Sequence, residues 1–202
     1  MTLTETQEME KKETTPPMTF RQYALCFECC SQEEREEQYA AIKRLPRPPK
    51  VCGKDVPENL NLITYGQLDD LHDSAEGVEA LLNCCTAILE VSEEEVWEER
   101  AERVLWFVSF CNKEVGRIND IFGRIKPDYD PEERIAGIEK LKFGSFGVLD
   151  WYAKRMGIND QEKVRDVPWV RIYRCMMNDN EIRRYEKRLR EVYNSRSKTK
   201  RK

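Results

Sequence analysis

The sequence predicts an all-α protein, a multi-helix bundle around one long central helix, with a disordered N-terminal tail and a basic C-terminal tail. A single stretch of about four heptads carries a continuous helical stripe of apolar residues. Charged residues make up 36% of the chain and hydrophobic residues 40%, a mixture that is common in long amphipathic helices. Alternating β-branched runs longer than a few residues, which would predict strands, do not occur.

The stretch from Ser92 to Ile125 is predicted to form the central helix. Ser92 is a good N-cap, and Glu95, three residues later, completes a capping box. Pro127 lies just beyond the predicted end. Apolar or small residues recur at alternating steps of four and three, at Trp97, Ala101, Val104, Val108, Cys111, Val115, Ile118, Phe122 and Ile125.

The middle of this stretch, residues 104–111, is apolar on every side. Only a helix that is surrounded by other helices tolerates such a sequence. We therefore expect other helices of the same chain to bury Trp106 and Phe107, while the acidic first turns stay exposed. Gly116 and Gly123, seven residues apart on another face, indicate a close neighbour there.

Shorter helices are predicted on both sides of the central helix, because residues with capping preference precede apolar residues at helical spacing. Before it, residues 50–61 form an extended connector with a turn at Gly53. After it, Gly157 is expected to end one helix in the left-handed conformation. The predicted helix starts are Thr19, Ser31 with Glu34, Thr64, Glu76, Asp130 with Pro131, Phe146, Asp166 and Asp179.

The last predicted helix follows Asp179 and has an apolar face made by Ile182, Tyr185, Leu189 and Val192. The chain as a whole is expected to comprise a disordered tail at residues 1–17, a single all-α domain at residues 18–193 and a basic tail at residues 194–202. Residues 1–17 are polar and end in two prolines, which favours disorder.

The C-terminal segment is strongly basic. Residues 183–202 contain ten basic and two acidic side chains, a net charge of +8, although the whole chain carries −4. Such a segment can bind nucleic acid or an acidic partner, dock on the acidic body of its own chain, or only complement the dipole of an ordinary last helix. The candidate contact residues are Arg183, Arg184, Lys187, Arg188 and Arg190.

Cysteine spacing offers one candidate metal site. Cys26 and Cys29 have the C-x-x-C spacing of zinc ligands, with Cys30 beside them and Cys52 further along. A second C-x-x-C pair is missing, so the alternative is that these cysteines are small buried hydrophobic residues of a helix. The sequence leaves open whether they bind zinc, and we predict no cofactor.

No catalytic constellation stands out. The single histidine, His72, has acidic neighbours that do not share its helical face, so it is expected to be a polar surface residue. Residues 143–147 (FGSFG) resemble a nucleophile elbow superficially, but they follow a predicted helix rather than a strand. Phosphate-binding loops and dinucleotide fingerprints are absent from the sequence. The prediction is therefore a protein that is not an enzyme.

The sequence also predicts a cytoplasmic protein. Residues 1–17 lack the apolar region of a secretory signal. The longest apolar run, residues 104–111, is far shorter than the ~20 residues that span a bilayer. The eight cysteines are therefore expected to be reduced.

Residues 62–71 (LITYGQLDDL) resemble the opening of some tail assembly chaperones of long-tailed phages. Residues 146–154, followed by residues 166–169, look like the later layout of such proteins, and the likeness covers residues 60–192. It implies a non-enzymatic protein of the host cytoplasm that coats the tape-measure protein, a long helical protein with exposed apolar stripes, and helps to recruit tail-tube subunits. We therefore expect a phage or prophage assembly factor that binds another protein; the alternative is a nucleic-acid-binding helical protein that uses the basic C-terminal helix and tail.

Overall fold

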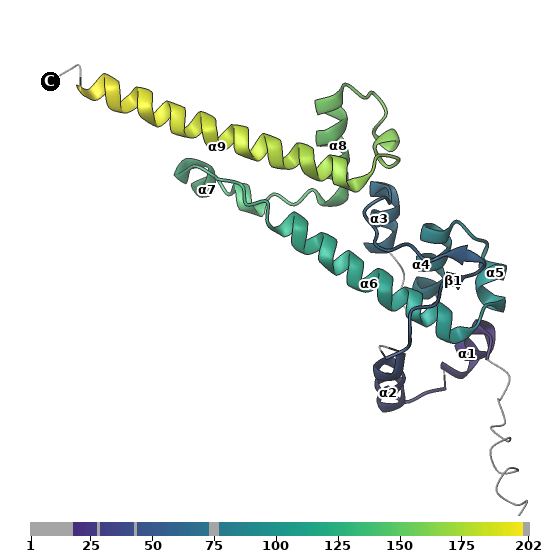
Figure 1. Ribbon diagram of the computed structural model, residues 1–202. Coiled ribbons are helices and arrows are strands. Elements are labelled where there is room, and N and C mark those ends of the chain that lie inside the picture. The colour runs from purple at the N-terminus through teal and green to yellow at the C-terminus, as the bar shows by residue number, and fades with distance from the viewer. Residues whose placement is uncertain (1–17, 28, 43, 73–76, 200–202) are drawn as a thin grey trace, which may run out of the picture.

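The computed structural model describes residues 18–27, 29–42, 44–72 and 77–199, and its architecture is helical (Figure 1). The predicted all-α class is confirmed, and none of the described helices is sufficiently long and apolar to cross a membrane. The expected tail at residues 1–17 lies outside the described residues. The helices are α1 (Phe20–Phe27), α2 (Gln32–Ile42), α3 (Tyr65–His72), α4 (Val78–Leu89), α5 (Glu93–Glu98), α6 (Ala101–Gly123), α7 (Pro131–Ile135), α8 (Gly144–Met156) and α9 (Trp169–Thr199), with 3₁₀ turns η1 (Ile138–Lys140) and η2 (Gln161–Val164).

The predicted central helix is interrupted. Its start is as expected, because the Ser92 hydroxyl accepts a hydrogen bond from the backbone N–H of Glu95 and the Glu95 carboxylate accepts one from Ser92. At Glu99 and Arg100, however, the backbone is extended and separates α5 from α6. The prediction of one continuous helix from residue 92 to residue 125 is therefore wrong.

The interruption has a tertiary cause. The chain that leads into α1 lies against the extended residues, so that Phe20 N–H donates to the Glu99 carbonyl (2.8 Å) and Ala101 N–H donates to the Met18 carbonyl (3.0 Å). These bonds replace intrahelical ones, and the Glu99 carboxylate accepts a further bond from Cys52 N–H (2.6 Å).

The connector after α2 contains a short antiparallel hairpin where no strand was predicted. Strands β1 (Lys50–Val51) and β2 (Lys54–Asp55) pair across a two-residue turn. Both turn residues have positive φ, 48° at Cys52 and 73° at Gly53, which is the conformation that two-residue hairpin turns require. Val51 is fully buried, so the hairpin closes one side of the core.

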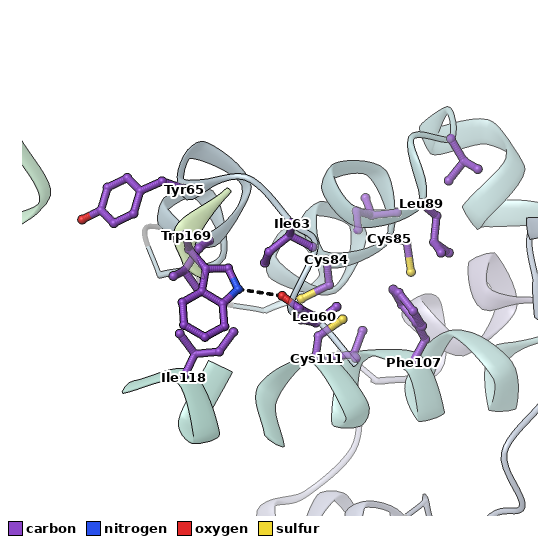
Figure 2. Close-up of a cluster of buried hydrophobic side chains, with 14 of the residues drawn as sticks. Leu60, Ile63, Tyr65, Cys84, Cys85, Leu89, Phe107, Cys111, Ile118 and Trp169 are labelled. Carbon is purple, nitrogen blue, oxygen red and sulfur yellow. Dashed lines mark hydrogen bonds between the residues drawn. The ribbon is translucent and has the colours of Figure 1, made fainter. Parts of the chain in front are cut away.

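The core lies between α6, α4 and the segment before α3 (Figure 2). As predicted, Phe107 at the centre of α6 is fully buried. Trp106 is only partly covered and stacks on Phe110, with 5.6 Å between ring centroids. The expected close neighbour at Gly116 and Gly123 is wrong, because a Cβ built on either glycine meets nothing within 4 Å.

The longest described helix is α9, with 31 residues. Two helices were predicted here, with Asp179 as the second N-cap, but the helix continues through Asp179, whose carboxylate binds the Arg155 guanidinium (3.0 Å). It also continues through Thr199, so the expected start of a separate tail at residue 194 is not seen. Figure 1 shows α9 extending away from the end of the molecule that carries α1 and α2.

Candidate partner-binding surfaces

Two adjoining cavities lie where α1 and α2 face α6, and together we call them the α1–α2 groove. The larger has a volume of about 470 Å³ and the smaller about 290 Å³. Tyr23, Ile42 and Leu105 line both, so the two cavities form one apolar depression. The other lining residues include Phe27, Leu81, Val108, Ser109 and Asn112 of the larger cavity and Met18, Ala41, Leu45 and Glu102 of the smaller.

The sequence of α2 explains why the groove stays open. The first turns of α2 are acidic, and its apolar residues come late, so that Ile42 at the C-terminal end is buried while residues 32–34 and 36–37 are exposed. A hydrogen bond from the Tyr23 hydroxyl to the Gln38 side chain (3.1 Å) joins α2 to α1. Because only the late residues of α2 pack inward, the rest of the helix leaves space above α6.

The groove has an acidic border. Helix α2 carries four glutamates and one arginine, a net charge of −3. Glu36 lines the larger cavity and Glu102 the smaller one. An apolar ligand with basic neighbours therefore fits the groove better than one with acidic neighbours.

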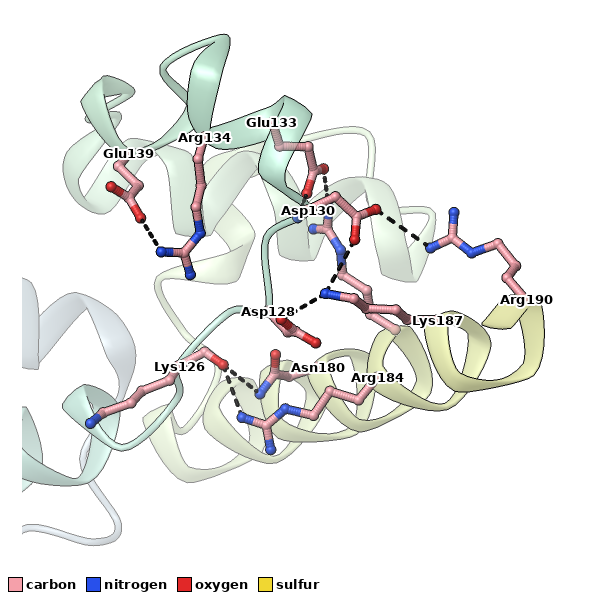
Figure 3. Close-up of polar contacts among 11 residues, drawn as sticks. Lys126, Asp128, Asp130, Glu133, Arg134, Glu139, Asn180, Arg184, Lys187 and Arg190 are labelled. Atoms are coloured by element: carbon pink, nitrogen blue, oxygen red, sulfur yellow. Dashed lines mark hydrogen bonds and ion pairs between the residues drawn. The ribbon is translucent and has the colours of Figure 1, made fainter. Parts of the chain in front are cut away.

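The second candidate surface is α9, which contains the basic residues that the sequence singled out. Four of those five residues contact residues 126–133, a segment that we call the strap (Figure 3). Lys187 Nζ lies 2.9 Å from an Asp128 oxygen and 3.2 Å from an Asp130 oxygen. Arg184 donates to the Lys126 carbonyl (3.0 Å).

Further contacts complete the attachment of the strap. Arg183 forms an ion pair with Glu133, and its guanidinium lies 5.8 Å from the centre of the Tyr129 ring. Arg190 lies 3.9 Å from Asp130. Arg188, the fifth predicted residue, is exposed. The basic face of α9 is thus used by the acidic strap of the same chain, which is one of the alternatives that the sequence left open.

Electrostatics of the strap follow from these pairs. The hydrogen bond from Lys187 lowers the pKa of the Asp128 carboxyl below its ordinary value, and Asp128 with Asp130 raises the pKa of Lys187. The start of α7 is capped as predicted, because Asp130 and Glu133 form a capping box with Pro131 between them. Asp130 therefore holds α7 and α9 at the same time.

The opposite face of α9 is apolar and uncovered. Ile182 is 53% exposed, Tyr185 57% and Val192 45%, with Leu189 between them half-buried. At about 100° per residue, these positions lie on the side of the helix that is opposite the strap contacts. We call Ile182, Tyr185, Leu189 and Val192 the α9 stripe.

The candidate zinc ligands are spread over two elements. Cys26 and Cys29 are exposed at the end of α1 and beyond it, whereas Cys52 is half-buried in the hairpin turn. Burial raises the pKa of the Cys52 thiol to about 11. Within the described part of the chain, no three histidine, cysteine or acidic side chains are grouped so that they could hold a metal ion.

The other residues considered from sequence lie as follows. His72 is at the end of α3, with its Nε2 3.0 Å from the Asn119 side-chain oxygen. The FGSFG segment forms the start of α8 and follows the η1 turn. The α1–α2 groove was not predicted, although the late position of the apolar residues in α2 was a signal that this helix packs only at one end.

Comparisons of the chain with protein-family models, with curated proteins and with solved structures found no match.

Proposed function

We propose that this chain is a non-catalytic binding protein that holds an apolar, base-flanked helix of another protein in the α1–α2 groove. The observation that carries the proposal is the groove itself, an apolar depression with glutamates at its border. Grooves of this kind bind amphipathic helices through two or three apolar side chains spaced three or four residues apart. A volume of about 470 Å³ accommodates large side chains of that type.

The specific role that we propose is that of a phage or prophage assembly factor, similar to a tail assembly chaperone. Such a protein must cover apolar stripes of a long helical partner until assembly. An apolar groove with a charged border, on a helical scaffold, suits that task. The resemblance of residues 62–71 supports this version of the proposal, and the position of the gene tests it. A neighbouring gene for a very long tape-measure protein is expected, and a metabolic operon would contradict it.

Binding to the groove can be measured with two synthetic helical peptides of about 20 residues. Both carry the same leucine stripe, with lysine flanks in one and glutamate flanks in the other. We expect the lysine-flanked peptide to bind the full-length protein more tightly in fluorescence anisotropy, because the border of the groove is acidic.

A variant that fills the groove provides the control. Asn112 is exposed and lines the larger cavity, so Asn112→Trp should block the groove without disturbing the core. Asp120→Trp places the same side chain at an exposed α6 position away from the groove. Loss of peptide binding in both variants, or in neither, would contradict the proposal.

Nucleic-acid binding by the basic C-terminal helix is the second candidate function, favoured by the net charge of +8 in residues 183–202. It is the weaker candidate because Arg183, Lys187 and Arg190 already face carboxylates of the strap. If it is correct, affinity for duplex DNA falls steeply with salt and deletion of residues 194–202 reduces it.

A further inference from the structure

We propose that the α9 stripe of one copy of this protein occupies the α1–α2 groove of a second copy. The inference rests on the proposed function, since it requires that the groove binds a helix, and it adds an occupant encoded by the chain itself. The two surfaces are complementary in chemistry and in charge.

The orientation of the second half of α9 is the reverse of what an amphipathic helix normally shows. A surface helix usually turns its apolar face to the core and its charged face to water. Here the charged face of α9 contacts the strap, whereas the stripe faces outward. A contiguous exposed apolar patch of this kind is typical of an interface.

The chemistry of the two surfaces is complementary. The stripe presents one aromatic and three aliphatic side chains at spacings of three, four and three residues, which is the arrangement of helices that insert into grooves. The groove presents Ile42, Leu81 and Leu105 together with aromatic side chains of α1. Burial of Tyr185 and Leu189 there would remove from water apolar surface that the single chain leaves exposed.

The charges are also complementary. Residues 181–196, which include the stripe, have six basic and three acidic side chains, a net charge of +3. Helix α2 at the border of the groove has a net charge of −3. Pairing of two α9 helices with each other would instead bring two segments of net positive charge together, which disfavours a symmetric α9–α9 contact.

The positions of the α9 stripe and the α1–α2 groove require that the contact forms between two molecules. The far half of α9 and the α1–α2 pair lie at opposite ends of the molecule (Figure 1), so the stripe cannot reach the groove of its own chain. A contact between two different surfaces is heterologous, and it continues from copy to copy into closed rings or open chains. Occupation by a second copy would also cover the groove until a partner helix competes for it.

The test is self-association of the full-length protein, measured by sedimentation equilibrium over a wide concentration range. The wild type is expected to show an average mass that rises with concentration and falls when salt screens the charges. Tyr185→Glu, at an exposed stripe position, and Asn112→Trp, in the groove, should each weaken association by about tenfold or more. Asp120→Trp should associate as the wild type does.

Mixing the two defective variants gives the decisive measurement. Tyr185→Glu retains an intact groove and Asn112→Trp an intact stripe, so an equimolar mixture should form heterodimers that grow no further. A wild type that stays monomeric at all concentrations would overturn the inference. So would self-association of Asn112→Trp at wild-type strength, which indicates an α9–α9 contact.

The same variants separate this inference from the proposed function. Tyr185→Glu should bind the lysine-flanked peptide at least as tightly as the wild type, because its groove is no longer occupied. If the peptide binds while the wild type remains monomeric, only the self-association fails. If no protein binds the peptide, the proposed function fails as well.

Discussion

The two halves of α9 are attached to the molecule in contrasting ways. At its start, Trp169 is buried, its indole N–H donates to the Leu60 carbonyl (2.8 Å), and the preceding residues pair with the chain before α3. Further along, from Asn180 to Arg190, the helix is held to the strap by ion pairs and polar hydrogen bonds. The first half has its apolar side chains inside the protein, and the second half has them outside.

This difference indicates that the two halves serve different purposes. Burial of a large aromatic residue contributes strongly to folding, whereas exposed ion pairs contribute little. The first half of α9 therefore belongs to the folded core, and the second half is positioned by polar contacts that leave its apolar stripe available. Matched substitutions in the two halves should therefore differ in their effect on stability.

Trp169→Ala should destabilise the protein by about 3–5 kcal/mol, because it creates a cavity and leaves the buried Leu60 carbonyl without its indole donor. Urea unfolding followed by circular dichroism measures the change. Tyr193→Ala, in the second half of α9 where the side chain is 61% exposed, is the matched control and should change stability by less than about 0.5 kcal/mol. Equal effects of the two substitutions would refute the division.

Gly66→Ala tests the close contact between α3 and the segment that leads into α9. A Cβ on Gly66 would lie 2.9 Å from Arg165 Cβ and 3.1 Å from the Arg165 carbonyl oxygen, so overpacking should cost about 1–3 kcal/mol. Gly116→Ala, on an open face of α6, should instead stabilise the protein by about 0.5–1 kcal/mol through helix propensity. Thermal unfolding of both variants distinguishes the loss of stability expected for Gly66→Ala from the gain expected for Gly116→Ala.

Lys187→Met removes the central ion pair of the strap, so we expect faster hydrogen exchange in residues 126–133 with little change in global unfolding. Lys187 lowers the pKa of Asp128 in the folded state. The stabilisation is therefore present at neutral pH, above the ordinary aspartate pKa of about 3.9, and is lost as pH falls through the lowered value. In the wild type, the hydrogen-exchange protection of the amides in residues 126–133, corrected for the pH dependence of intrinsic exchange, should decrease in this acidic range. The decrease should be smaller in Lys187→Met. Arg188→Met, at an exposed position, should leave the strap unchanged.

Ile182→Ser should have the smallest effect on stability, within about 0.5 kcal/mol in dilute solution, because Ile182 is already 53% exposed. The matched substitution in the first half is Ile172→Ser, where the side chain is fully buried and the cost should reach several kcal/mol. Unfolding at low protein concentration keeps self-association out of the measurement. A large loss for Ile182→Ser under these conditions would mean that the stripe packs within its own chain.

Features that depend on neighbouring residues were predictable. The capping boxes at Ser31 and Ser92, the N-cap at Asp130 and the left-handed end of α8 at Gly157 were all expected from the sequence and are present. Each involves groups within about four residues of one another, so no other part of the chain is needed to form it.

Features that depend on distant segments were not predictable. The break at Glu99 and Arg100 is made by residues near position 19, some eighty positions earlier in the chain. Asp179 likewise does not cap a new helix, and its carboxylate is bound by Arg155 of another helix, α8. The α1–α2 groove also arises only when α2 is placed over α6.

The basic face and the apolar stripe of α9 show most clearly the difference between features set by local sequence and features set by distant segments. The amino-acid sequence alone determined that this helix has both faces, because helical periodicity assigns each residue to a side. Which face points inward is set by the tertiary structure, because it depends on where the acidic strap lies. The strap contacts the charged side, and the apolar side of the helix faces outward.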